Sequence, residues 1–161
     1  MLTEIHLAKE NFKFSAGHFT IFSATERENL HGHNFTAGVT IECEVLENGM
    51  TFDYGLAKRA VEKLCRSLND TFLLPGNSPH LRIQEVDDHV FAVFANEKIP
   101  FLRRDATVLP LENVTVEELA RWFLEQFIKE FASEAAYRIR ALAVEINSGP
   151  GQGATMRRQL A

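Results

Sequence analysis

Three histidines have the residue type and spacing to hold a metal ion. His31 and His33 flank one glycine in 28-ENLHGHNF-35, directly before an apolar, strand-like run. In an extended backbone, side chains two residues apart point to the same side, so the two imidazoles can share one ion. His18 ends an earlier strand-like run, and antiparallel pairing of the two runs would bring it beside them. Three imidazoles with a fourth position left for water or substrate make a catalytic zinc site, whereas an isolated pair in a polar turn is simply solvated.

Two glutamates can add acid–base chemistry or a binding contact. Glu28 lies three residues before His31, close enough to reach a metal-bound water or substrate and exchange a proton with it, although a solvated loop glutamate is the alternative. Glu145 is flanked by Val144 and Ile146 in an apolar strand, so its charge is expected to face a pocket or an interface. A planar heterocycle with two N–H groups would satisfy it bidentately, and an ion pair between subunits would also do so.

The elements that must position these groups are visible in the hydrophobic periodicity. Even spacing of apolar residues predicts strands over residues 3–16, with a slip near residues 9–11, and over residues 34–47 and 137–146. That slip is interpreted as a bulge. Between residues 53 and 68 the period changes to that of an amphipathic helix.

The rest of the chain supplies a second helix and an extra segment. The helix begins after Thr115, because that hydroxyl and Glu118 fit a capping box. Short alternating runs over residues 80–104 predict one or two β-hairpins, and the glycine-rich residues 147–161 predict a C-terminal tail. The order of elements predicts a single α+β domain over residues 1–161, with two helices on one face of an antiparallel sheet.

Composition narrows the class of protein. The net charge of −5 comes from interspersed charges without a basic block, which argues against a nucleic-acid-binding protein. No apolar run reaches membrane length and the first residues lack the pattern of a signal peptide, so a cytoplasmic protein without membrane contact is expected. The two cysteines, Cys43 and Cys65, lie in strand-like and helix-like runs and are predicted to be buried rather than reactive.

The histidine stretches 12-FKFSAGH-18 and 31-HGHNF-35 resemble the paired motifs of the 6-pyruvoyl-tetrahydropterin and 6-carboxy-tetrahydropterin synthase family. Similar landmarks follow in 50-MTFDYGLAKRAV-61, in 115-TVEELA-120 and at Glu145, so the resemblance spans most of the chain. The segment over residues 80–104 resembles a hairpin insertion of some bacterial and archaeal relatives.

The resemblance implies a fold, an assembly and a set of ligands. The fold is the T-fold, in which two helices pack on a four-stranded antiparallel sheet and the sheet edges assemble into an oligomeric barrel, here a homohexamer built as a dimer of trimers. Zn²⁺ would be held by His18, His31 and His33. The substrate would be a pterin, 7,8-dihydroneopterin triphosphate, and the resemblance assigns substrate contacts to Glu145 and Thr115.

The sequence departs from the common family pattern at two places. Arg27 stands where familiar members carry a cysteine base, and a guanidinium cannot take up a proton. Asn69 and Asp70 align with the family's Asp-His pair, so the helper histidine is missing as well. A type III branch instead carries Glu-x-x-His-Gly-His, which 28-ENLHGH-33 matches.

That branch implies cleavage of the pterin side chain to release 6-hydroxymethyl-7,8-dihydropterin for folate synthesis. Glu28 would be the base, and Asp70 would either assist it or cap the turn after the first helix. Two alternatives remain open. One is a 6-carboxy-tetrahydropterin or 6-pyruvoyl-tetrahydropterin synthase homologue in queuosine or pterin synthesis. The other is a non-catalytic, zinc-dependent, pterin-binding oligomer.

Overall fold

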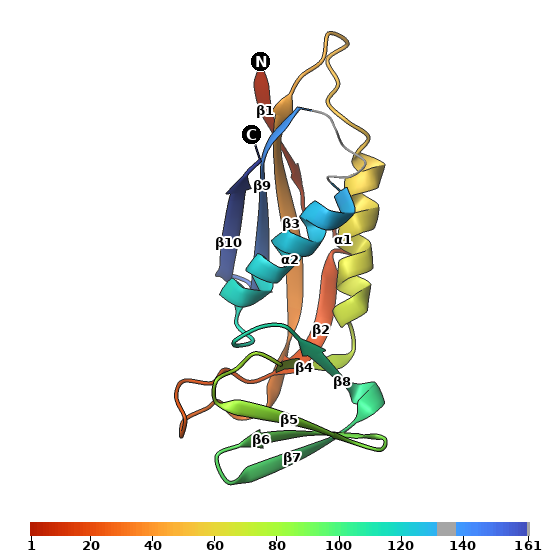
Figure 1. Ribbon diagram of the computed structural model, residues 1–161. Helices are drawn as coiled ribbons and strands as arrows, with labels where there is room; N and C mark the ends of the chain where they lie inside the picture. The colour runs from red at the N-terminus through yellow and green to blue at the C-terminus, as the bar shows by residue number, and fades with distance from the viewer. Residues whose placement is uncertain (132–137, 161) are drawn as a thin grey trace.

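The longest strand, β3 (His31–Glu44), is the centre of the main sheet (Figure 1). The computed structural model describes residues 1–131 and 138–160 of the chain. The antiparallel neighbours of β3 are β1 (Leu2–Leu7), β2 (Lys13–His18) and β9 (Ile139–Gly149), and β9 pairs in turn with β10 (Gln152–Gln159). Alternate residues of β3 from Phe35 onward are buried, as expected for a strand with one face on the core. The strand begins three residues earlier than predicted, so both histidines lie inside it.

The slip predicted near residues 9–11 is a break between two strands. β2 pairs with the first half of β3 and β1 with the second half, while residues 8–12 bulge out opposite residues 37–38. The turn is closed by the amide of Phe12, which donates to the carbonyl of Lys9 at 3.0 Å. This arrangement keeps β2 in register with β3 up to its last residue, where His18 pairs directly with His31.

The C-terminal segment is a strand rather than the predicted tail. Residues 147–149 complete β9, and β10 follows after a turn in which Gly151 has a φ of 79°. A positive φ favours glycine, so the glycines that suggested a tail are the residues that make the hairpin. Nearly all of β10 is exposed, which explains the absence of an apolar alternation. Tyr137, where the last strand was predicted to begin, lies outside the described residues.

Two helices cover one face of the main sheet (Figure 1). In α1 (Tyr54–Leu68) the side chain of Asp53 caps the first turn by accepting from the amide of Gly55 at 2.8 Å. In α2 (Val116–Phe131) the hydroxyl of Thr115 accepts from the amide of Glu118 at 3.2 Å, which confirms the predicted start. The apolar stripes of both helices join the strands in the main core. Within the described residues, no helix is long and apolar enough to cross a membrane.

The main sheet contains more strands than the predicted four, and not all of them are antiparallel. β4 (Thr71–Pro75) pairs in parallel with β2, and β8 (Ala106–Leu109) pairs in parallel with β4. Parallel neighbours need a long crossover connection, and between β4 and β8 the insertion provides it.

The predicted hairpin insertion forms a second, three-stranded sheet at one end of the molecule (Figure 1). Its antiparallel strands are β5 (Leu81–Val86), β6 (His89–Phe94) and β7 (Glu97–Leu102), followed by the short 3-10 helix η1 (Arg103–Asp105). The prediction of hairpins is confirmed. This small sheet has a hydrophobic cluster of its own, separate from the main core.

Candidate metal centre

The three histidines form one cluster on the helix-covered face of the sheet, called here the histidine cluster (His18, His31 and His33). One ligating atom from each lies within 4.8 Å of those of the others. The rings of His31 and His33 are 4.8 Å apart between centroids, and their Nε2 atoms are 3.1 Å apart. The prediction that strand pairing brings the three imidazoles together is confirmed, because His18 and His31 are direct partners in the ladder.

The chain orients two of these rings through backbone carbonyls. Nδ1 of His18 lies 2.8 Å from the carbonyl oxygen of Val114, and Nδ1 of His31 lies 2.7 Å from that of Asn29. A carbonyl only accepts, so each Nδ1 carries the proton and each Nε2 keeps a free lone pair. This is the tautomer that a metal-binding imidazole needs, and contacts of this kind fix the ring orientation.

The buried nitrogen of His18 lacks a polar neighbour. Its Nε2 has no hydrogen-bond partner in the part of the chain that the structure describes, although His18 is 6% exposed. Burial, together with the neighbouring imidazoles, lowers the pKa of His18, so the ring is neutral near neutral pH. A buried polar atom without a partner is costly, and a metal ion would satisfy it. The cluster therefore fits a three-histidine metal site.

The glycines beside the histidines are required by the close approach of the strands. Gly32 pairs with Gly17 in the β2–β3 ladder. A Cβ on Gly32 would lie 2.9 Å from the carbonyl oxygen of Ala16, and one on Gly17 would lie 2.3 Å from the ring of Phe72. The spacing His-Gly-His therefore places two imidazoles on one face while the intervening position stays free of a side chain.

Glu28 is the carboxylate that the chain itself brings to the cluster. Its Oε2 lies 3.8 Å from Nε2 of His31, while its Oε1 accepts from the amide of Thr20 at 2.9 Å. Burial alone would raise the pKa of Glu28, but hydrogen bonds from Thr20 and the nearby imidazoles outweigh it and leave the pKa lowered. The group is thus ionised near neutral pH, the form of a proton acceptor.

Thr115 lies beside the cluster through its neighbour Val114. Its hydroxyl caps α2, as described above, and Val114 supplies the carbonyl that orients His18. The side chain of Asn113 fixes this segment by accepting from the amide of Ile21 at 3.0 Å and donating to the carbonyl of Ile21 at 2.9 Å. Sequence reasoning missed Asn113, because its partner is 92 residues away and no local pattern marks the pair.

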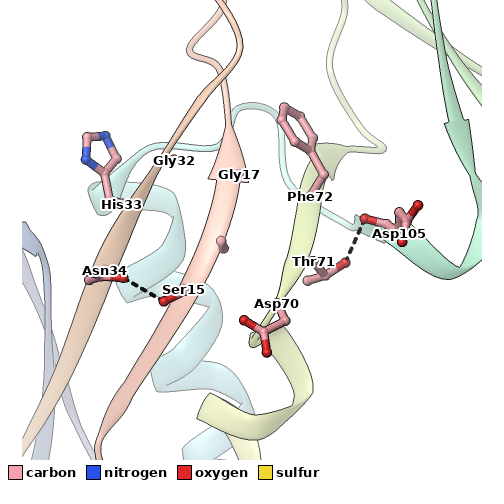
Figure 2. Close-up of a pocket in the computed structure, with 10 residues that line it drawn as sticks. Ser15, Gly17, Gly32, His33, Asn34, Asp70, Thr71, Phe72 and Asp105 are labelled. Carbon is pink, nitrogen blue, oxygen red and sulfur yellow. Dashed lines mark hydrogen bonds between the residues drawn. The ribbon is translucent and has the colours of Figure 1, made fainter.

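Asp70 is not brought to the histidine cluster within one chain. It lines an open cavity of about 430 Å³ together with Ser15, Asn34, Asp105 and His33. In the view of Figure 2, β2 and β3 lie between its carboxylate and the imidazole of His33. Its φ of 56° and the bond from its amide to the carbonyl of Ser15, at 2.7 Å, show that it shapes the turn after α1.

Glu145 is also remote from the cluster, on the opposite face of the sheet. It pairs with Gly38 of β3, and partners in an antiparallel ladder point to the same side, opposite to that of His31 and His33. As predicted, it faces a pocket, called here the Glu145 cavity: about 170 Å³, lined also by His6, Thr40, Thr155 and others. The Glu145 carboxylate accepts from the side-chain amide of Asn147 at 2.7 Å.

Neither cysteine takes part in the site. Cys43 and Cys65 are each 1% exposed, which confirms the prediction that they are buried. Burial raises the pKa of both thiols, that of Cys65 to about 12. The position next to Glu28 is held by Arg27, whose guanidinium donates to both carboxylate oxygens of Glu97 at 3.1 Å.

Comparison with known proteins finds similar sequences and similar structures. A protein of Methanocaldococcus jannaschii named "Putative 6-carboxy-5,6,7,8-tetrahydropterin synthase" is 26% identical over 161 residues, 99% of this chain and 98% of that protein. The crystal structure of 6-pyruvoyl tetrahydropterin synthase from Plasmodium vivax matches with a TM-score of 0.93 and 29% identity, covering 99% of each chain. A mutant of that enzyme, also with a TM-score of 0.93 and at 28% identity over 99% of each chain, has alanine in place of a glutamate described as a catalytic residue.

The match to the family as a whole covers almost the entire chain. The sequence profile of 6-pyruvoyl tetrahydropterin synthase aligns with residues 6–159, which include the histidine cluster, Glu28 and Glu145. The fold is that of the solved structure from Plasmodium vivax. The chain belongs to the 6-pyruvoyl tetrahydropterin synthase family, whose T-fold it adopts.

Proposed function

We propose that the protein is a zinc-dependent lyase that cleaves the side chain of 7,8-dihydroneopterin triphosphate and releases 6-hydroxymethyl-7,8-dihydropterin. The observation that carries the proposal is the position of Glu28, whose ionised carboxylate lies 3.8 Å from the ligating nitrogen of His31. A base beside a metal-bound hydroxyl is the arrangement that breaking a carbon–carbon bond next to that hydroxyl requires.

Zinc is the ion assigned to this ligand set, although three imidazoles also suit iron, nickel or copper. His18, His31 and His33 offer three neutral nitrogens and leave a fourth position open, the pattern of a catalytic rather than a structural zinc site. When bound, zinc would polarise the hydroxyls of the substrate side chain and lower their pKa.

The chain supplies the proton transfer. Because Oε1 of Glu28 is occupied by the amide of Thr20, Oε2 is the oxygen free to accept a proton from the second side-chain hydroxyl. The oxygen of this substrate hydroxyl becomes the carbonyl oxygen of an aldehyde. At the same time the bond between the first and second side-chain carbons breaks, and the electron pair of that bond passes into the pterin ring. A proton returned to the first carbon completes the hydroxymethyl product, and the other product is a two-carbon aldehyde that keeps the triphosphate.

Ring binding is assigned to Glu145 and Thr115. Two charge-assisted hydrogen bonds from the ring N–H groups would satisfy the Glu145 carboxylate. Since Glu145 and the histidine cluster occupy opposite faces of one chain, we infer that one copy supplies the metal and another supplies Glu145. A homohexamer assembled through the sheet edges fits this requirement, and it would bring Asp70 to the site of a neighbour in the same way.

Two comparisons bear on the reaction. The glutamate described as catalytic in the Plasmodium vivax enzyme supports a glutamate base, and both cysteines here are too buried to supply a thiolate. The name of the Methanocaldococcus jannaschii relative favours a second candidate, a 6-carboxy-tetrahydropterin synthase.

Product analysis separates the candidates. Zinc-loaded protein incubated with 7,8-dihydroneopterin triphosphate is expected to release 6-hydroxymethyl-7,8-dihydropterin, identified by chromatography and mass spectrometry. Formation of only 6-carboxy- or 6-pyruvoyl-tetrahydropterin would support the second candidate. Tight binding without turnover would support a non-catalytic pterin-binding protein.

A further inference from the structure

The segment that carries Glu28 is fastened to the small sheet (β5–β7). Residues 19–30, called here the Glu28 loop, join β2 to β3 and lie beside the small sheet at the end of the molecule (Figure 1). Phe19 and Ile21 of the loop are buried in the hydrophobic cluster of that sheet with Val90 and Phe94 of β6. The loop therefore depends on the insertion for its core.

Arg27 makes the polar part of this connection. Its Nε and one terminal nitrogen donate to Oε1 and Oε2 of Glu97, each at 3.1 Å, and its other terminal nitrogen donates to the carbonyl of Glu28 at 2.8 Å. The guanidinium also lies over the rings of Phe19 and Phe94, 5.3 and 5.9 Å from their centroids. The side chain of Arg27 is 16% exposed, so its charge is partly buried. The guanidinium is hydrogen-bonded on one side to Glu97 and on the other to the carbonyl of Glu28.

Glu97 lies where β6 turns into β7. It is the first residue of β7 and pairs with Phe94 across a two-residue turn in which Ala95 has a φ of 50°. A two-residue turn with positive φ at its first position matches the twist of the two strands that it joins. The carboxylate of Glu97 is thus presented to Arg27 from the end of a regular hairpin.

The backbone of Glu28 is held on both of its sides. Its amide donates to the carbonyl of Thr20 at 2.9 Å, and its carbonyl accepts from Arg27. The side chain adds the bond to the amide of Thr20. Loss of the Arg27 contact would remove the hydrogen bond on one side of the Glu28 backbone. A small displacement of a reacting group lowers the reaction rate strongly.

We propose that Arg27 and Glu97 are positioning residues that hold Glu28 against the histidine cluster, so that the small sheet forms part of the catalytic apparatus. The inference rests on the proposed function for the role of Glu28. Arg27, which stands where familiar members of the family carry a cysteine, and the insertion that carries Glu97 then act together to position Glu28.

Two single substitutions and their combination test this pairing. Arg27→Lys keeps the charge but loses the planar fork, and Glu97→Gln removes the charge of its partner. Each is expected to lower kcat by about 10- to 100-fold with KM changed by no more than about twofold and zinc content unchanged. The double variant is expected to be no slower than the worse single variant, because both changes break the same contact.

A matched control exists at the far end of the same sheet. Arg103 is 3.1 Å from Glu85 and donates to the carbonyl of Asp87, so it has the same kinds of partner without touching the Glu28 loop. Arg103→Lys is expected to leave kcat unchanged. The proposal is overturned if Arg27→Lys and Glu97→Gln both retain the wild-type kcat, or if Arg103→Lys loses as much as they do.

Hydrogen exchange separates this inference from the proposed function. In Glu97→Gln, amides of residues 19–30 are expected to exchange at least about tenfold faster than in the wild type, while those of residues 13–18 in β2 are unchanged. An unaltered exchange rate in the loop would overturn the coupling whatever the reaction is. A wild type that forms no product would instead contradict the proposed function and leave this readout valid.

Discussion

The histidine cluster and the Glu145 cavity occupy opposite faces of one sheet and differ in how complete a single chain leaves them. In the cluster, two rings are oriented by backbone carbonyls, Glu28 is anchored, and the buried Nε2 of His18 has no hydrogen-bond partner among residues 1–131 and 138–160. In the cavity, Glu145 is exposed and contacts the side chain of Asn147 two residues away. One chain thus orients its metal-binding histidines and Glu28 by itself, whereas the proposed ring contact at Glu145 would be completed by another copy of the chain.

The largest effect is expected from removing a ligand of the cluster. His33→Ala leaves two imidazoles. Loss of a group that only hydrogen-bonds a ligand typically costs about 10- to 100-fold in metal affinity, so loss of the ligand itself should lower zinc affinity by at least about 100-fold, and activity should fall with it. Metal content after dialysis and product formation measure both. Asn34→Ala changes the next residue of β3, which points to the other face and hydrogen-bonds Ser15, so it should retain its zinc. A full equivalent of zinc in His33→Ala would contradict the assignment.

A smaller effect is expected on the other face. Glu145→Ala removes the carboxylate assigned to the ring, and losing charge-assisted hydrogen bonds should weaken pterin binding by about 10- to 100-fold. Zinc content should be unchanged, because the histidines lie across the sheet. Quenching of pterin fluorescence measures the affinity.

Mixing subunits decides whether the two halves come from different copies. Glu28→Gln and Glu145→Ala chains are unfolded together, refolded as mixed oligomers and assayed at a low pterin concentration, at which each variant alone has little activity. Random assortment should restore roughly a quarter of the wild-type activity, because some sites then receive both intact residues from different chains. No recovery would show that both residues of a site belong to one chain.

The smallest effect concerns the helix that supports the metal face. Hydrogen bonds from Arg121, at 2.8 and 2.9 Å, hold the pKa of Glu118 below its ordinary value at the start of α2. A lowered pKa means that the pair stabilises the fold above the unfolded pKa of Glu118 and that this contribution is lost as pH falls through the folded value. Arg121→Ala should cost about 0.5 kcal/mol of unfolding free energy at pH 7 and less below about pH 4, measured by urea unfolding. An equal cost at both pH values would be inconsistent with this origin.

The metal side of the site was readable in the sequence because its signals are local. Two histidines at a spacing of two in a strand must share a face, and a third at the end of the preceding strand meets them by hairpin pairing. The start of α2 was readable for the same reason, since Thr115 caps an amide three residues away.

Other features depend on pairing between distant residues or on register. Arg27 and Glu97 are 70 residues apart in the sequence, so no local pattern predicts their contact. The parallel pairing of β4 with β8 depends on how the insertion between them crosses over, which the sequence pattern does not give. Which face Glu145 occupies is set by its register against Gly38, because a shift of one residue would turn it to the other side. β10 was missed because a mostly exposed strand lacks the apolar alternation by which strands are found.

The role of Glu28 is tested most directly by Glu28→Gln, which keeps the size of the side chain and removes its ability to accept a proton. The account predicts that zinc content stays at the wild-type level while release of 6-hydroxymethyl-7,8-dihydropterin falls by about 10²- to 10⁴-fold, the usual contribution of a general base. Both quantities are measured on the same preparation. Turnover at the wild-type rate in zinc-loaded Glu28→Gln would contradict the account.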